Sequence, residues 1–129
     1  MVSRRAVVPR DGRGPRSDCP IACSLDVIGD RWTLVIVRDL FRGKHRFSEF
    51  LDSGEGIKTN ILAERLKRLE RAGLVERTAY QEHPPRYEYH LTGAGRALAP
   101  VVKAIYAWGE AHAPGARGLR SVRRKREQD

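Results

Sequence analysis

Residues 58 to 72 place hydrogen-bonding side chains at a spacing that suits contact with the edges of DNA base pairs. The amide of Asn60 can pair bidentately with adenine, and Lys67 can donate to the acceptor atoms of guanine. Ala63 is small enough to touch a thymine methyl group, and the carboxylate of Glu64 can accept from cytosine N4. Arg68, further along, is expected to reach the phosphate backbone.

An amphipathic helix over roughly 58–72 would bring these residues to one side. At about 100° per residue, Leu62, Leu66 and Leu69 fall within about 60° of one another and must face a core. The polar residues fall on the opposite side, and Gly73 is placed to end the helix. Taken alone, a basic amphipathic helix is more often just exposed to solvent, so the case for DNA contact depends on the segments that flank it in the chain.

Two strand-like segments follow, LVERTAY at 74–80 and RYEYHL at 86–91, with a turn, EHPP, between them. They predict an antiparallel hairpin whose tip carries His83 and Arg86, within reach of a minor groove or a phosphate. Lys44 and Arg46, before the helix, are phosphate candidates that position the protein without specifying sequence. The full expected DNA-binding set is Lys44, Arg46, Ser48, Lys58, Thr59, Asn60, Ala63, Glu64, Lys67, Arg68, His83 and Arg86.

The remaining segments are predicted to be helical. A first helix begins at Pro20 and is ended by Gly29, and a second, over 31–41, can be capped by Asp30 and ended by Gly43. The expected inner face of the second helix is Trp32, Val35, Ile36 and Leu40, and a short third helix contains Phe47, Ser48, Phe50 and Leu51.

A long last helix follows Thr92, which can cap it, and Pro100 should kink this helix or delay its start. The fold class predicted from these elements is mostly α with a small antiparallel β-hairpin (α+β), in the order that a winged helix-turn-helix requires.

The charge of the chain is concentrated near its ends. The net charge is +9, but residues 1–18 hold five arginines against two aspartates, and residues 114–129 hold six basic residues against two acidic ones. We predict disordered basic tails at 1–17 and 113–129 around one domain at 18–112. These tails can attract phosphate or simply keep the protein in solution, and both interpretations stay open.

The composition is that of a cytoplasmic protein. No apolar run approaches the ~20 residues of a membrane span, no secretory signal is evident, and two cysteines suggest thiols instead of a disulfide framework.

The chain resembles the HxlR-type winged helix-turn-helix regulators, relatives of the MarR group. The matching text is CPIACSLDVIGDRW, RFSEF, GIKTNILAERLKRLERAGLVERTAYQEHPPRYEYHLTGAGRAL and AWGEAH, over about 19–112. The resemblance implies a transcriptional regulator that binds a palindromic operator in double-stranded DNA as a homodimer. Lys58 departs from the pattern, since many relatives have a small capping residue there, and we expect Thr59 to cap the helix instead.

The resemblance also implies that the first and last helices hold the dimer together. The apolar stripe over 98–108 is more than one small core needs, which independently favours packing against a partner. The expected interface residues are Ile21, Leu25, Leu98, Val101, Val102, Ile105 and Trp108.

Cys19 is a candidate redox sensor. Several relatives sense oxidants or electrophiles through a cysteine just before a proline at the start of the first helix, which is the position of Cys19. The unpaired N–H groups of a helix N-terminus also favour a thiolate. Cys23, one turn on, is a poor disulfide partner and is expected to be buried. A switch at Cys19 would use its counterpart in the other subunit or a small thiol or electrophile; a merely tolerated cysteine is the alternative.

No cofactor, metal site or enzymatic activity is expected. The four histidines have no zinc-site spacing, and the chain has no phosphate-binding glycine loop or nucleophile motif. Two functions remain: a regulator that binds specific DNA, and a winged-helix module that binds another protein. Only the first predicts a steep loss of affinity with salt.

Overall fold

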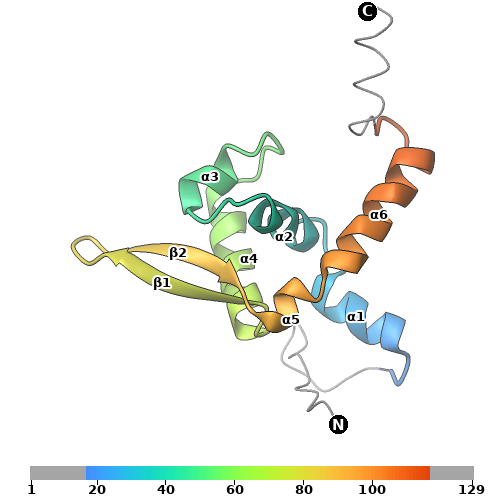
Figure 1. The fold of residues 1–129 in the computed structure, drawn as a ribbon, viewed down its shortest axis with the longest axis horizontal. Coiled ribbons are helices and arrows are strands. Elements are labelled where there is room, and N and C mark those ends of the chain that lie inside the picture. The colour runs from blue at the N-terminus through green and yellow to red at the C-terminus, as the bar shows by residue number, and fades with distance from the viewer. Residues whose placement is uncertain (1–16, 117–129) are drawn as a thin grey trace, which may run out of the picture. The chain divides into compact units, whose positions relative to one another are not determined.

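The computed structural model describes residues 17–116 (Figure 1). The predicted tails therefore lie almost wholly outside the described residues. The elements are α1 (Pro20–Ile28), α2 (Thr33–Phe41), α3 (Phe47–Leu51), α4 (Thr59–Arg71), β1 (Val75–Gln81), β2 (Arg86–Leu91), α5 (Gly93–Arg96) and α6 (Ala99–His112). The chain forms two compact units, which divide between Ala97 and Leu98. The predicted fold class, mostly α with one antiparallel hairpin, is confirmed.

Helix α1 has the predicted bounds, with Pro20 in its first turn and Gly29 after its last residue. Proline suits the first turn because its missing N–H would have no partner within the helix. Its apolar residues do not enter the core of the unit, since Ile21 is 71% exposed and Leu25 is 53% exposed.

Helix α2 begins two residues later than predicted. The Asp30 carboxylate accepts from the backbone N–H groups of Trp32 and Thr33, so the predicted capping contact forms, but the helix starts at Thr33. The later start is accompanied by a different inner face, in which Val37 is buried, whereas the predicted Trp32 and Val35 are partly exposed. The buried residues are Thr33, Ile36, Val37, Asp39 and Leu40.

The core of the first unit lies where α2, α3, α4 and the start of β1 meet. Phe50 of α3 is buried together with Leu62, Leu66 and Leu69 of α4, the three residues predicted to face the core. Sequence periodicity missed Ile57, Leu74 and Val75, which are also buried. Ile57 precedes α4, while Leu74 and Val75 follow it, so no helical pattern includes them.

Helix α4 ends at the predicted glycine. Gly73 has a φ of +77°, in the left-handed region that glycine adopts without a steric penalty. Its N–H donates to Glu70, and the N–H of Leu74 donates back to Leu69, both at 3.0 Å. This Schellman motif satisfies the last carbonyls of α4 and directs the chain into β1.

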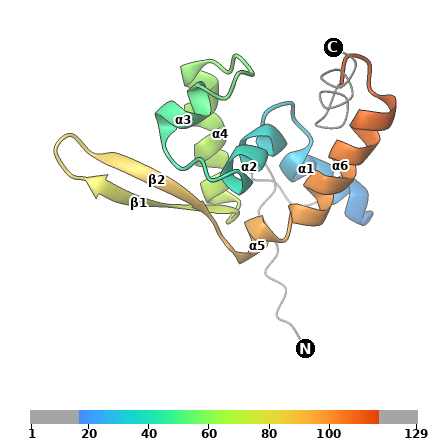
Figure 2. The same cartoon turned by 45° about the horizontal axis from the view of Figure 1, so that its top comes forward.

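Strands β1 and β2 pair antiparallel, with Val75 opposite Leu91 and Ala79 opposite Tyr87. The predicted EHPP turn joins them, and the hairpin tip extends away from α2, α3 and α4 (Figure 1 and Figure 2). The segment before α3 adds to the sheet, because Tyr89 donates its N–H to the His45 carbonyl at 2.8 Å. A bridge between Arg46 and Glu88 extends this pairing. The hairpin is therefore fixed to the helices at its base.

The predicted last helix is divided into two. Thr92 caps α5, since its hydroxyl accepts from Gly95 N–H at 3.2 Å, and α6 begins at Ala99 with Pro100 in its first turn. Of the two effects predicted for Pro100, a delayed start is the one observed. Within its own unit, α6 buries no residue, and Ile105 and Trp108 are 52% and 64% exposed. No helix between residues 17 and 116 has the length and apolar content needed to cross a membrane.

Candidate nucleic-acid interface

Helix α4 separates an apolar side from a polar side. Leu62, Leu66 and Leu69 are each at most 2% exposed, whereas Asn60 and Lys67 are exposed. Ala63 and Arg68 are partly exposed. The predicted division of the helix is therefore present, with the candidate base-contacting residues on the solvent side.

The start of α4 differs from the prediction. Lys58 occupies the N-cap position with extended backbone, and no side chain caps the helix. Thr59 is the first helical residue instead of the cap, so the prediction for Thr59 was wrong. Both residues are exposed beside the free N–H groups of the first turn, a position that suits a phosphate oxygen.

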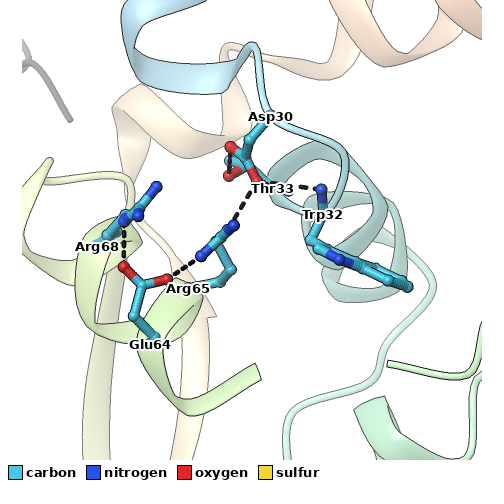
Figure 3. Close-up of polar contacts among 6 residues, drawn as sticks. All are labelled: Asp30, Trp32, Thr33, Glu64, Arg65 and Arg68. Atoms are coloured by element: carbon cyan, nitrogen blue, oxygen red, sulfur yellow. Dashed lines mark hydrogen bonds and ion pairs between the residues drawn. The ribbon is translucent and has the colours of Figure 1, made fainter. Parts of the chain in front are cut away.

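The Glu64 carboxylate is less available to accept a hydrogen bond from DNA than its place on the polar side of α4 suggested. Its carboxylate forms ion pairs with Arg65 and with Arg68, so both oxygens have a cationic partner (Figure 3). Arg65 also donates from Nε to Asp30 Oδ2 at 2.8 Å, which connects α4 to the turn before α2. The sequence argument missed Arg65, because its partner lies 35 residues earlier in the chain.

The environment of Asp30 stabilises its charged form. Burial alone would raise the pKa of Asp30, but hydrogen bonds from Thr33, Arg65 and the Trp32 backbone N–H outweigh it. The result is a pKa of about 2.

The segment before α3 and the wing, defined here as residues 75–91, position further basic groups. Arg46 lies 3.9 Å from the centre of the Tyr80 ring and 3.9 Å from Glu88, so the wing holds its guanidinium in place while half of the side chain remains exposed. Lys44 is partly exposed and Ser48 is exposed. His83 and Arg86 are exposed at the wing tip, as predicted.

Glu49 orders the entry into α3. Its carboxylate accepts from the backbone N–H groups of His45 and Arg46, at 3.1 and 2.9 Å. These backbone hydrogen bonds, first that of His45, lower the pKa of Glu49. The His45 ring lies 4.4 Å from the His90 ring and bonds through Nδ1 to the Tyr89 carbonyl, so it joins the wing to the helices. His45 is half-buried at this junction.

The two cysteines are free thiols. Cys19 is exposed at the N-cap of α1, the place that the sequence indicated. Cys23 is half-buried instead of buried, and its thiol donates to the Ser17 carbonyl at 3.0 Å. Among residues 17–116 no three potential ligands lie close enough together to hold a metal ion.

A helix-turn-helix whose second helix has an exposed polar side, followed by a two-stranded wing, defines the winged-helix class of DNA-binding proteins. The sequence pattern of the HxlR-like helix-turn-helix family matches residues 27–116, and the chain belongs to this family.

Known relatives agree with this assignment. The uncharacterized HTH-type transcriptional regulator sll1512 of Synechocystis sp. is 40% identical over 91 residues, which are 70% of this chain and 67% of the relative. The redox regulator HypR in its oxidized form has a TM-score of 0.66 and 39% identity, covering 73% of this chain and 97% of HypR. The reduced form of the regulator YodB from Bacillus subtilis has a TM-score of 0.62 and 34% identity, covering 78% and 99%. This chain is a DNA-binding transcriptional regulator.

Proposed function

We propose that the protein binds a palindromic operator as a homodimer, with α4 of each subunit in a major groove and each wing against the adjacent backbone. The observation that carries this proposal is the exposed polar side of α4, opposite Leu62, Leu66 and Leu69. A polar helix side flanked by a basic hairpin can contact base edges and phosphates at the same time.

The roles of the side chains follow from their chemistry. Asn60 and Lys67 contact adenine and guanine in the major groove, and Ala63 allows close approach. The phosphate contacts are assigned to Lys44, Arg46, Ser48, Lys58, Thr59, Arg68, His83 and Arg86. In this account the protein acts by binding alone, without catalysis, on DNA in the cytoplasm.

The dimer is proposed from exposed apolar side chains on α1 and α6. Ile21 and Leu25 of α1, and Ile105 and Trp108 of α6, are each more than half exposed. Large apolar side chains that a helix leaves exposed favour burial against a second copy. Val101 is 36% exposed, and Leu98 and Val102 are partly exposed, so each can contribute to the same interface.

Fluorescence anisotropy tests the DNA-binding proposal. The probe is a labelled duplex of roughly 30 bp, selected by the protein from a random library, and the control is a scrambled duplex of equal composition. We expect the selected duplex to bind about 10³-fold or more tightly, with affinity falling steeply as salt rises. Affinity indifferent to both salt and sequence would instead support the alternative, a winged-helix module that binds protein.

We further propose that oxidation of Cys19 changes the affinity for the operator. Two facts support this: Cys19 is exposed at the N-cap of α1, and HypR, a similar structure, is named a redox regulator. The test compares operator affinity before and after treatment with diamide in the wild type, Cys19→Ser and Cys23→Ser. We expect Cys19→Ser alone to abolish the response; an unchanged response in that variant would show that Cys19 is merely tolerated.

A further inference from the structure

Four charged side chains form a continuous series from the turn before α2 to the polar side of α4. In order they are Asp30, Arg65, Glu64 and Arg68, called here the ion-pair network (Figure 3). The guanidinium of Arg65 lies between two carboxylates, with Nε toward Asp30 and Nη1 toward Glu64. Arg68 contacts the other oxygen of Glu64 through Nε.

The inner half of the ion-pair network, Asp30 and Arg65, is nearly buried and fixed by several hydrogen bonds. The side chains of Asp30 and Arg65 are 9% and 16% exposed, and Asp30 also accepts from Thr33 and from the backbone of Trp32. A carboxylate with this many donors in a nearly buried site fixes the orientation of the arginine that it binds. Asp30 therefore fixes the Nε of Arg65 in the interior of the unit, while Nη1 of the same guanidinium contacts Glu64 at the surface of α4.

The outer half of the ion-pair network, Glu64 and Arg68, balances the charge of an exposed carboxylate. Glu64 is 40% exposed, yet each of its oxygens already has an arginine partner. The charge of the carboxylate is thereby balanced, and neither oxygen is left without a donor. Glu64 thus differs from Asn60 and Lys67, whose exposed side chains make no polar contact within the described residues.

We propose that Asp30 and Arg65 are positioning residues for DNA binding, which hold Glu64 in an ion-paired state so that α4 approaches DNA without an unbalanced carboxylate. In this role Glu64 reads no base, and the direct readout falls to Asn60, Ala63 and Lys67. The inference rests on the proposed placement of α4 in the major groove. An unpaired carboxylate there would repel phosphate, whereas the two carboxylates and two arginines of this series balance one another and present no excess negative charge.

The first test is Glu64→Gln, an exposed change that keeps the shape of the side chain. It removes a negative charge and releases Arg68 Nε from its ion pair, which strengthens the contact of Arg68 with phosphate, so we expect roughly fivefold tighter binding to the selected and the scrambled duplex alike at ~0.1 M salt. The slope of log affinity against log salt should steepen by up to about 0.9. Asp18→Asn, an exposed change before α1 and outside the residues assigned to DNA, is the matched control for net charge and should change either affinity less than twofold.

The second test examines whether Arg65 acts through Glu64. Arg65→Lys keeps the charge, but a single ammonium cannot bridge two carboxylates as the guanidinium does. We expect a loss of roughly three- to fivefold on both duplexes, because Glu64 becomes less balanced. In the Glu64→Gln background the same change should alter affinity less than twofold, a coupling that general destabilisation would not produce.

The outcomes separate this inference from the proposed function. If the wild type shows no preference for the selected duplex, the proposed function fails. If the wild type binds as proposed but Glu64→Gln loses roughly tenfold, and only on duplexes that keep one particular cytosine, then Glu64 reads that base and the inference is wrong. Equal effects of Arg65→Lys in both backgrounds would also overturn it. Should Arg65→Lys fail to fold, the Glu64→Gln comparison decides alone.

Discussion

At the scale of single residues, Asp30 has two structural roles: it accepts from the N–H groups at the start of α2 and it binds Arg65 of α4. Its folded pKa of about 2 lies below the ordinary value of 3.8. The unfolded chain therefore binds the proton more tightly. The stabilisation is complete above about pH 4 and is lost as the pH falls toward about 2.

We predict that Asp30→Asn lowers the free energy of unfolding by about 2 kcal/mol at neutral pH. In the variant, the part of the decline in stability between about pH 4 and about pH 2 that belongs to Asp30 should disappear. Urea denaturation across this range measures both effects. Asp52→Asn, an exposed carboxylate after α3, is the control and should change stability by no more than about 0.5 kcal/mol. Equal stability of Asp30→Asn and wild type would refute the account of Asp30.

Residue chemistry could be predicted where it depends on local spacing. Asn60 and Lys67 follow from the period of α4 and are exposed as expected. The ion pairing of Glu64 could not be predicted, because it depends on Arg65, whose orientation is set by Asp30 in the turn before α2. Long-range ion pairs of this kind leave no periodic trace in a sequence.

At the scale of elements, α5 controls how the chain leaves β2. Gly95 of α5 lies against the backbone where α4 passes into β1, and a Cβ at this position would meet the Leu74 carbonyl oxygen at 2.1 Å and Leu91 Cδ2 at 2.9 Å. Thr92 strengthens the same junction, since its hydroxyl donates to the Gly73 carbonyl at 2.6 Å.

Gly95→Ala should therefore lower the free energy of unfolding by about 2–3 kcal/mol, since backbone and core must shift to admit one methyl group. Gly93→Ala is the matched control, because its Cβ would come no closer than 4.0 Å, to the end of Arg96. We expect Gly93→Ala to be as stable as wild type within about 0.5 kcal/mol. Thermal denaturation of the two variants side by side makes the comparison, and equal melting temperatures would contradict the close packing of α5.

The elements themselves were largely predictable, and their ends less so. The periods of α1 and α4 and the alternation of β2 predicted the correct segments, because residues that the sequence displays bound them: Pro20 and Gly29 for α1, Gly73 after α4, and the EHPP turn before β2. The start of α2 was displaced by two residues, since Asp30 caps through a turn at Arg31 and Trp32 instead of directly. For Pro100, a kink and a delayed start were equally compatible with the sequence.

At the scale of the whole molecule, the proposed homodimer accounts for apolar surface that one chain leaves exposed. We predict that Ile105→Glu, in the middle of α6, shifts the protein toward monomer, because the charge would have to be desolvated in the interface. Operator affinity should fall by about tenfold or more, since one subunit reaches a single half-site. Sedimentation velocity at several concentrations measures the first effect.

Lys103→Glu, an exposed change on the same helix outside the apolar stripe, is the control for charge reversal. We expect this variant to remain dimeric, because surface substitutions away from an interface change stability only slightly. A wild type that sediments as a monomer at all concentrations would remove the basis for a two-fold symmetric operator.

The central claim is that the exposed side of α4 lies in the major groove, and methylation interference on the selected duplex tests it most directly. Methylation of guanine N7, which lies in the major groove, should weaken binding of the wild type at positions related by a two-fold axis. In Lys67→Ala, we predict that interference disappears at one guanine in each half-site and persists elsewhere. An identical pattern in the wild type and Lys67→Ala, or interference confined to minor-groove atoms, would contradict the placement of α4.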